Sequence, residues 1–297
     1  MSNIPGLGWS SGAYVPGSTP SGYAAFASWR GRLLDVVVDW PARQRWSDIV
    51  DPAWLYRAWA GTQYTKVFGV AMIPENDGAS LESCAQGEYD ARWRQFGSNI
   101  AMAGLAASTI IRLGWEFNTD NFVWAARDPD AFSACWRRVF TAAETTAPEL
   151  RWDWTVNRGP SQALSDPRAA YPGDAYVDIV GVDTYDMWPA VMTDSDWAVH
   201  YSGPYGLRFW ADFADSHGKP LSVPEWGVIS GTLEAGHSGG DNPLFVERMF
   251  QFFQSLGPNL AYEAYFNAEG SGCGCALNDP TNNPLAAAAY RSAYEPG

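Results

Sequence analysis

Two glutamates, each at the end of a short apolar run, are the residues of this sequence best suited to chemistry. Glu116 ends the run 109–115, and Glu225 ends the run 220–224. Apolar runs of this length that are rich in β-branched residues predict buried parallel strands. Two carboxylates that face each other at the ends of such strands can cleave a glycosidic bond, one as acid and one as nucleophile. The alternative is an ion pair for each glutamate, but the tryptophan beside each one favours the catalytic interpretation.

The elements that must position these glutamates alternate between strand-like and helix-like patterns along the chain. Such alternation is typical of a parallel α/β sheet. Eight strands are expected at residues 12–15, 33–38, 65–72, 109–113, 150–156, 177–182, 221–223 and 261–266. Helices are expected at residues 23–28, 52–60, 88–103, 128–146, 190–218 in pieces, 242–256 and 285–294. Only the connection at residues 158–175 lacks a convincing long helix.

Eight parallel strands with interposed helices predict an α/β protein of the closed (β/α)8 TIM barrel type. The length of 297 residues agrees with this fold, since such barrels commonly contain about 250 residues. No Gly-x-Gly-x-x-Gly follows the first strand, which argues against a dinucleotide-binding fold. Because no repeat or low-complexity linker divides the sequence, we expect residues 1–297 to form one catalytic domain.

The carboxyl ends of barrel strands form the active face of this fold. The residues expected there share polar or aromatic side chains, which a polyhydroxylated substrate requires. They include Asp39, Trp40, Trp115, Glu116, Asn118, Asn157, Tyr185, Glu225 and Trp226. Trp124, Trp188 and Trp226 are candidate platforms on which the apolar face of a sugar ring can stack. Packing in the core is the alternative role for Trp124 and Trp188.

Composition restricts the class of partner. The net charge of −14 argues against nucleic acid, which requires clustered Lys and Arg, and against an anionic membrane surface. A neutral sugar is compatible with this charge. The 16 Trp, 14 Tyr and 14 Phe residues provide flat faces for it, although core packing also uses such rings. We therefore expect a polysaccharide or oligosaccharide partner.

Compartment and metal content are predicted from what the sequence lacks. No run approaches the roughly 20 apolar residues of a membrane span, and residues 1–6 do not form a secretory signal. We expect a monomer that acts outside the cell, after removal of a leader or after release, for instance on lysis or with a phage particle. The spacing of Cys273 and Cys275 is too tight for typical zinc sites. We expect no metal and no cofactor, and the pairing of the four cysteines stays open.

Three local sequences resemble the retaining glycoside hydrolases of clan A, and most closely family 26, which includes β-mannanases and β-1,3-xylanases. The family sequence Arg-x-x-His-Glu-x-Asn resembles residues 112–118, and Val-Asp-x-x-Gly-x-Asp-x-Tyr resembles residues 177–185. Lys-Pro followed by Glu-x-Gly resembles Lys219-Pro220 and 225–227. The order of the strands fits the family over residues 12–290.

The resemblance implies a role for each glutamate. Glu116 would be the acid/base, protonated at rest, and apolar neighbours would raise the pKa of its carboxyl. Glu225 would be the ionised nucleophile, oriented by a hydrogen bond from Tyr185. Asn118 or Asn157 would bind a sugar hydroxyl near the cleaved bond. Retention requires the two carboxyl groups to lie about 5–5.5 Å apart, whereas about 6.5–9.5 Å means inversion.

One departure from the family sequence leaves the substrate open. The family histidine that precedes the acid/base is Trp115 here, and the resemblance implies that this histidine shapes the subsite of the sugar whose bond is cut. We expect an endo-acting retaining glycoside hydrolase, with β-mannan as the family default. The alternatives are hydrolysis of a bacterial cell-wall arabinan, galactan or mannan, and a barrel that binds glycan without cutting it.

Overall fold

The computed structural model describes residues 6–270, 272–278 and 282–295. Residues 1–5 of the segment inspected for a leader lie outside this range. Eight strands follow one another in chain order around a closed parallel barrel, which confirms the predicted (β/α)8 fold. They are β1 (Ser10–Tyr14), β2 (Val36–Asp39), β3 (Thr65–Val70), β4 (Thr109–Leu113), β5 (Arg151–Asn157), β6 (Ile179–Tyr185), β7 (Leu221–Gly227) and β8 (Leu260–Phe266).

The chain divides into two compact units. The first unit comprises the described residues of Met1–Val38 and Val182–Gly297, and the second unit comprises Asp39–Gly181. A single catalytic domain over residues 1–297 therefore stays a prediction.

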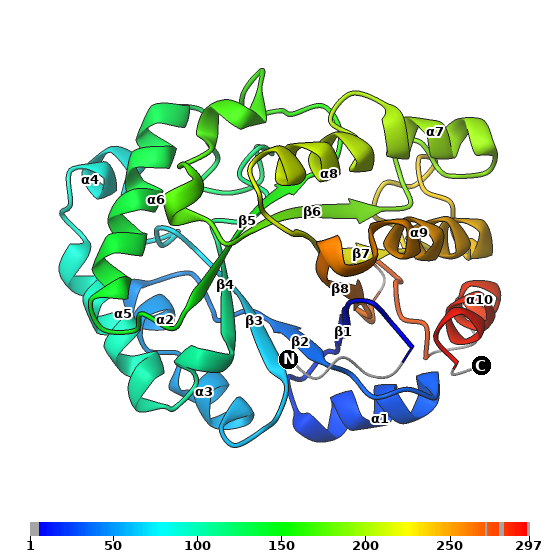
Figure 1. The fold of residues 1–297 in the computed structure, drawn as a ribbon, viewed down its shortest axis with the longest axis horizontal. Coiled ribbons are helices and arrows are strands. Elements are labelled where there is room, and N and C mark those ends of the chain that lie inside the picture. Colours follow the sequence, from blue (N-terminus) through cyan, green and yellow to red (C-terminus); the bar gives the residue numbers. More distant parts are fainter. Residues whose placement is uncertain (1–5, 271, 279–281, 296–297) are drawn as a thin grey trace. The chain divides into compact units, whose positions relative to one another are not determined.

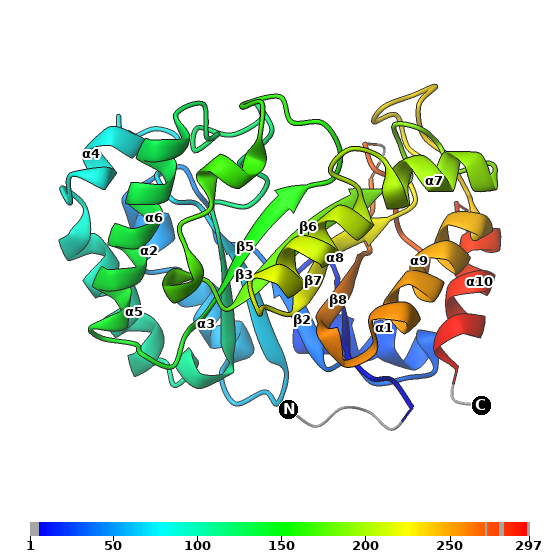
Figure 2. The same cartoon turned by 45° about the horizontal axis from the view of Figure 1, so that its top comes forward.

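In the second unit, β4 pairs in parallel with β3 and with β5. Its helices α4 (Leu81–Ala85), α5 (Asp90–Met102) and α6 (Pro129–Glu144) lie side by side (Figures 1 and 2). Asp128 caps α6 by accepting hydrogen bonds from two backbone N–H groups, and proline occupies the first turn, as is favourable at a helix start. A disulfide between Cys84 and Cys135 joins α4 to α6.

In the first unit, β8 pairs in parallel with both β1 and β7. The unit also contains helices α1 (Pro20–Arg30), α7 (Asp194–Ser202), α8 (Leu207–Ser216), α9 (Pro243–Leu256) and α10 (Pro284–Tyr294), of which α9 and α10 lie side by side (Figure 1). The apolar face of α9 is buried, because Phe245, Met249 and Phe253 recur at helical spacing on it.

Strand β7 is longer than predicted and includes Glu225. Its register against β8 passes from Val223 opposite Glu263 to Trp226 opposite Tyr265, so three residue steps on β7 match two on β8. This irregularity contains Pro224, which has no N–H to donate and is tolerated where the ladder is interrupted. Bulges often occur next to active sites, where they change the direction of a side chain.

The sequence missed two short helices, α2 (Trp46–Val50) and α4. A helix of about one turn shows too little periodicity to be distinguished from a loop. The prediction that no long helix connects β5 to β6 is confirmed. This connection contains only short 3-10 helices at Pro167–Ala170 and Asp174–Tyr176. Within the described residues, every helix is too short or too polar to cross a bilayer.

Candidate active site

The backbone of Glu116 adopts an uncommon conformation directly after β4. Its φ of 49° lies in the left-handed region, and Gly114, two residues earlier, has a φ of 52°. For a residue with a side chain this conformation costs about 1–3 kcal/mol, so neighbouring structure must enforce it. The Gly114 N–H donates to the Val70 carbonyl over 2.8 Å, and the Glu116 N–H donates to the Thr155 carbonyl over 3.0 Å. Two neighbouring strands thus hold the residue in place.

Two asparagines determine where the Glu116 carboxylate lies. The Asn157 side-chain amide donates to Oε1 of Glu116 over 2.6 Å. The Asn118 amide donates to the Asn157 carbonyl and its Oδ1 accepts from the Asn157 N–H, both over 2.8 Å. Asn118 is buried and thus holds the backbone of Asn157. Both residues thus position Glu116, while the contact of Asn118 or Asn157 with a sugar hydroxyl stays a prediction.

Trp115 and Trp124 form a buried aromatic cluster with Phe122. The rings of Phe122 and Trp124 stack at 4.6 Å, and the Trp124 indole N–H donates to the Trp115 carbonyl over 3.0 Å. The Arg43 guanidinium lies 5.3–6.0 Å from the three ring centroids and pairs with Glu75 over 2.7 Å. Trp115 is 4% exposed and Trp124 is fully buried. Trp124 therefore has the core-packing role that was the alternative to a sugar platform, and neither indole offers a face to a sugar.

Asp39 and Trp40 differ in their access to solvent. The Asp39 carboxylate is buried, and it accepts hydrogen bonds from the Trp59 indole at 3.1 Å and from the Trp40 N–H at 2.9 Å. Asp39 is therefore a structural acceptor, not a residue that faces substrate. Trp40 is partly exposed, with the Arg112 guanidinium 5.9 Å from its ring. Its indole lies against Gly69, where a Cβ would collide with the ring.

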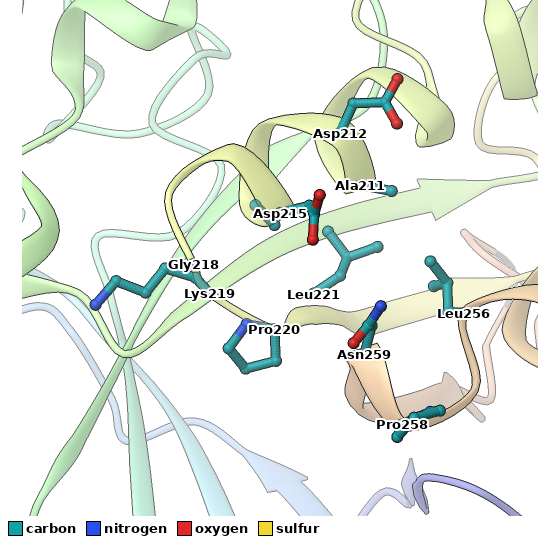
Figure 3. Close-up of a pocket in the computed structure, with 11 residues that line it drawn as sticks. Ala211, Asp212, Asp215, Gly218, Lys219, Pro220, Leu221, Leu256, Pro258 and Asn259 are labelled. Carbon is teal, nitrogen blue, oxygen red and sulfur yellow. The ribbon is translucent and has the colours of Figure 1, made fainter.

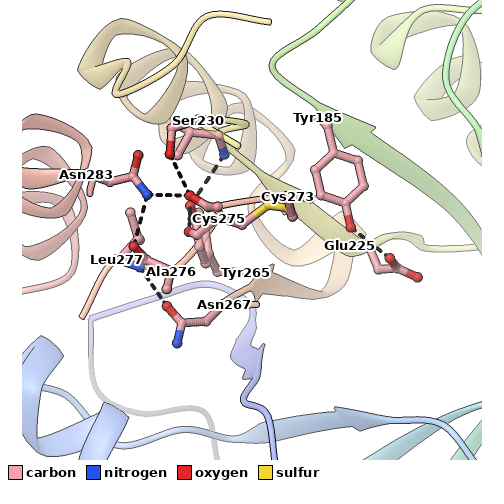
Figure 4. The surroundings of a disulfide bond; sticks show 12 residues. Tyr185, Glu225, Ser230, Tyr265, Asn267, Cys273, Cys275, Ala276, Leu277 and Asn283 are labelled. Carbon is pink, nitrogen blue, oxygen red and sulfur yellow. Dashed lines mark hydrogen bonds between the residues drawn. A yellow bond between two sulfur atoms is a disulfide. The ribbon is translucent and has the colours of Figure 1, made fainter. Parts of the chain in front are cut away.

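The carboxylate of Glu225 is oriented by Tyr185, as predicted. The Tyr185 hydroxyl, at the end of β6, donates to Oε2 of Glu225 over 2.8 Å (Figure 4). Glu225 is 7% exposed, so most of the carboxylate is shielded and its hydrogen bonds strongly influence its orientation. The Tyr185 ring packs edge-on against Phe266 at 5.8 Å, which restricts the hydroxyl in turn.

Trp226, next to Glu225, is a core residue. Its side chain is fully buried among Phe253, Tyr265 and other rings, and its indole N–H donates to Oε2 of Glu263 over 2.7 Å. It therefore has no exposed face for a sugar, in contrast to the prediction. Burial raises the pKa of Glu263, while hydrogen bonds from Ser11 and Trp226 and the charge of Arg30 partly offset this.

Trp188 is the predicted sugar platform that stays accessible, at 54% exposed. Its partners, Glu234 and His237, were not predicted from the sequence. One signal was present in the sequence. The predicted strand ends at residue 223 and the next predicted helix begins at residue 242, and loops longer than about 12 residues without secondary structure are usually functional or disordered.

A second disulfide, between Cys273 and Cys275, lies in the segment after β8 (Figure 4). The Gly274 carbonyl accepts hydrogen bonds from the Ser230 hydroxyl at 2.7 Å and from the Asn283 amide at 2.6 Å. The Tyr265 hydroxyl donates to the Cys275 carbonyl over 2.8 Å. These contacts fix the segment against the loop after β7. Among the described residues, no group of three or more His, Cys, Asp or Glu side chains is arranged to bind a metal ion.

A pocket of about 540 Å³ lies in the first unit (Figure 3), near the amino-terminal end of β7 and away from Glu225. It is lined by Lys219, Pro220 and Leu221 at the start of β7, with Asp212 and Asp215 of α8. Active sites of this fold lie at the carboxyl ends of the strands, whereas the amino-terminal face serves stability. Glu225, near the other end of β7, is the better guide to the active site.

Comparison with known proteins shows a partial family match. Residues 98–203 match the model of glycosyl hydrolase family 26. The matched segment contains Glu116, Asn118, Asn157 and Tyr185, whereas Glu225 lies beyond it. The resemblance noted in the sequence is thus confirmed over this segment. No protein of curated function matches the chain significantly.

Solved structures show the same fold at low sequence identity. An endo-β-1,4-mannanase double mutant from Cellulomonas fimi is 18% identical, with a TM-score of 0.70 over 98% of this chain and 72% of the other. The catalytic domain of a family 26 endo-β-1,4-mannanase from Bacillus sp. JAMB-750 is 14% identical, with a TM-score of 0.68 over 97% and 86%. A fungal β-1,4-galactanase is 14% identical, with a TM-score of 0.63 over 94% and 93%. These proteins are similar to this chain in fold.

Proposed function

Because residues 98–203 match glycosyl hydrolase family 26, we propose that this chain is an endo-acting, retaining glycoside hydrolase of a neutral polysaccharide. Glu116 acts as the acid/base and Glu225 as the nucleophile. One observation carries the proposal: each predicted glutamate accepts a short hydrogen bond from a side chain at the end of a barrel strand. Asn157 is the donor to Glu116 at 2.6 Å, and Tyr185 is the donor to Glu225 at 2.8 Å.

The reaction proceeds in two displacements. In the first, a carboxylate oxygen of Glu225 attacks the anomeric carbon while Glu116 gives its proton to the departing oxygen. The glycosidic bond breaks and a glycosyl ester forms. In the second, the ionised Glu116 takes a proton from water, whose oxygen attacks the anomeric carbon and releases Glu225. Two inversions at one carbon give net retention.

The first substrate to test is β-1,4-mannan, because mannanases are among the structures with this fold. A second candidate is β-1,4-galactan, or an arabinan, galactan or mannan of a bacterial cell wall. This candidate is favoured by Trp115, which replaces the family histidine and packs into the aromatic cluster with Phe122 and Trp124. Because the imidazole is absent, the subsite beside Glu116 differs in shape and hydrogen bonding from that of the family.

The first experiment measures new reducing ends from β-1,4-mannan, β-1,4-galactan and arabinan. Wild type is compared with Glu116→Gln, Glu225→Gln and the exposed control Glu82→Gln on α4. We expect product from wild type and from the control on at least one glycan, and a loss of about 10³-fold or more in Glu225→Gln. No product from wild type on any glycan favours a barrel that only binds glycan. Wild-type rates from Glu225→Gln remove the nucleophile assignment.

The second experiment assigns the roles by azide rescue, with dinitrophenyl glycosides of the sugar identified above. This leaving group needs no proton, so Glu116→Ala still forms the glycosyl ester, and azide then yields a glycosyl azide of retained configuration. In Glu225→Ala, azide occupies the site of the missing carboxylate and attacks directly, which yields the inverted azide. NMR of the products distinguishes the two. Inverted azide from Glu116→Ala contradicts the assignment.

The same proposal extends to the setting of the enzyme. The buried disulfide between Cys84 and Cys135 supports action outside a reducing cytosol, since such bonds persist mainly in oxidising compartments. We propose a monomer that acts on glycan outside the cell or after release. Size-exclusion chromatography with light scattering tests the monomer, and a mass of two chains contradicts it.

A further inference from the structure

The loops that follow β6 and β7 form a small aromatic structure around Trp188. The Trp188 indole stacks on the His237 imidazole with 3.6 Å between ring centroids and 15° between planes. The indole N–H donates to Oε2 of Glu234 over 3.0 Å. The Trp188 N–H also donates to the His237 carbonyl over 3.2 Å, next to a β-bridge between Met187 and Ser238. Trp188 is thus held through its ring face, its ring edge and its backbone.

The backbone of these loops is held in an uncommon conformation. Trp188 and Glu234 each have a φ of 54°, in the left-handed region. Among the described residues only five that are not glycine have a positive φ, and Glu116 is another of them. Such outliers cluster at active sites and ligand clamps, where surrounding structure enforces them. The conformation of Trp188 is therefore imposed by its surroundings, as expected for a binding residue.

A buried carboxylate provides the anchor for both loops. Oδ1 of Asp186 accepts from the Val191 N–H over 2.8 Å, and Oδ2 accepts from the Asn242 amide over 2.7 Å. The Asp186 carbonyl accepts from the Gly239 N–H over 3.0 Å. A Cβ on Gly239 would collide with the Asp186 carboxylate, so the loops approach closely only with glycine here. The fixed loops keep Trp188 oriented before any ligand binds.

Despite these contacts, Trp188 is 54% exposed, whereas Trp115, Trp124 and Trp226 are buried. The structure fixes the indole at one face and at its N–H edge while much of its surface stays in water. A large exposed ring with low mobility binds at little entropic cost. Trp188 is also only three residues beyond Tyr185, whose hydroxyl binds Glu225. The ring therefore belongs to the same end of the strands as the proposed nucleophile.

We propose that Trp188 is a preorganised platform for one pyranose ring of a neutral β-1,4-linked oligosaccharide. Glu234 and His237 are positioning residues, which act by fixing the plane and rotation of the indole. The ligand contact is the apolar C–H face of the sugar on the indole. This inference rests on the proposed function for the identity of the ligand, while binding itself requires neither glutamate to react.

The test measures binding and catalysis separately. Mannohexaose and β-1,4-galactohexaose are titrated by calorimetry into Glu225→Gln, which binds without turnover. Trp188→Ala, His237→Ala and His237→Phe are added to this background, with Trp54→Ala as a control. Trp54 is an exposed tryptophan on α3 (Ala53–Trp59) and is 47% exposed. The same substitutions in the active enzyme give KM and kcat.

We expect Trp188→Ala to raise the Kd and KM at least tenfold with kcat within twofold, because the contact contributes equally to ground state and transition state. His237→Ala raises the Kd about three- to fivefold. His237→Phe restores it to within twofold, since phenylalanine supplies a flat ring for the stack. Trp54→Ala leaves Kd, KM and kcat within twofold of the values for the protein into which it is introduced.

The outcomes separate this proposal from the proposed function. Hydrolysis by wild type together with an unchanged Kd and KM in Trp188→Ala overturns the platform and keeps the hydrolase. Binding that depends on Trp188 without hydrolysis by wild type keeps the platform and overturns the hydrolase. Failure of His237→Phe to restore the Kd overturns the positioning role of His237. No binding of either hexasaccharide overturns the platform as stated.

Discussion

The side-chain amide of Asn157 donates a hydrogen bond to Oε1 of Glu116 over 2.6 Å. Asn157 is the last residue of β5. Its backbone carbonyl and its backbone N–H each form a hydrogen bond with the side-chain amide of Asn118. The proposed acid/base is therefore positioned by a chain of amides from neighbouring structure. Its left-handed backbone places the carboxyl where this contact forms.

The first prediction concerns Asn157. Asn157→Ala should raise the pKa of the Glu116 carboxyl, because an N–H donor stabilises the ionised form. The basic limb of the profile of kcat/KM against pH then moves to higher pH. The maximum of kcat/KM should fall about 10- to 100-fold because the acid is less well oriented. This loss is part of the rate enhancement of about 10²–10⁴-fold that general acid–base catalysis supplies.

The matched control is Asn99→Ala on α5, which removes the hydrogen bond from the Asn99 side-chain amide to the Val50 carbonyl of α2. It should leave the pH profile unchanged. A basic limb that stays in place or moves to lower pH in Asn157→Ala contradicts the assigned contact.

The second prediction concerns Tyr185. Tyr185→Phe removes the hydroxyl that donates to Glu225 and keeps the ring that packs on Phe266. We expect kcat to fall about 10- to 100-fold, since a charge-assisted hydrogen bond contributes about 1.5–3 kcal/mol. KM and Tm should change little. Tyr171→Phe, which removes an exposed bond to Asp174, is the control. An unchanged kcat in Tyr185→Phe would exclude an orienting role.

The third prediction distinguishes core packing from sugar binding at Trp226. Trp226→Phe keeps a ring among Phe253 and Tyr265 but removes the donor to Glu263. We expect the free energy of unfolding to fall by about 1–3 kcal/mol, as for other buried groups that lose a partner. Urea denaturation measures this, and KM should stay within twofold. A raised KM with unchanged stability would restore Trp226 as a sugar platform.

The fourth prediction uses the raised pKa of the buried Glu263 carboxyl. Because the folded protein holds this proton more tightly than the unfolded chain, Glu263 costs stability as the pH rises above about 4.5, the usual value for glutamate. Glu263→Gln has no such titration. The difference in unfolding free energy should therefore shift in favour of the variant between pH 4 and pH 7. A difference that is constant, or that shifts toward wild type, contradicts the predicted direction of the pKa.

The fifth prediction compares the two disulfides. The bond between Cys84 and Cys135 closes a loop with a sequence separation of 51, whereas Cys273 and Cys275 are separated by 2. From the loss of loop-closure entropy in the unfolded chain, we expect the first bond to stabilise the fold by about 4 kcal/mol and the second by much less. Calorimetry should show a large fall in Tm for the double serine variant at 84 and 135. An equal fall for the double serine variant at 273 and 275 would rule out this account.

Much of the fold and part of the site follow from local patterns. All eight strands were predicted because buried parallel strands form apolar runs between helical segments. The contact of Tyr185 with Glu225 followed from the family sequence. The bulge at Pro224 and Glu225 was not predicted, because it depends on how β7 aligns with β8. The roles of Asn118 and Asn157 were not predicted either, because an asparagine in a sequence does not reveal which group it bonds.

The sequence by itself determined the order of the elements and the two glutamates at strand ends. Only the tertiary structure decided which aromatic rings stay exposed. Trp226 and Trp188 both lie near polar residues at a strand end, yet Trp226 is buried and hydrogen-bonded to Glu263, 37 residues away, while Trp188 is exposed. The physical reason is that periodicity records the average burial of an element. Whether one ring is covered depends on side chains that distant segments bring to it.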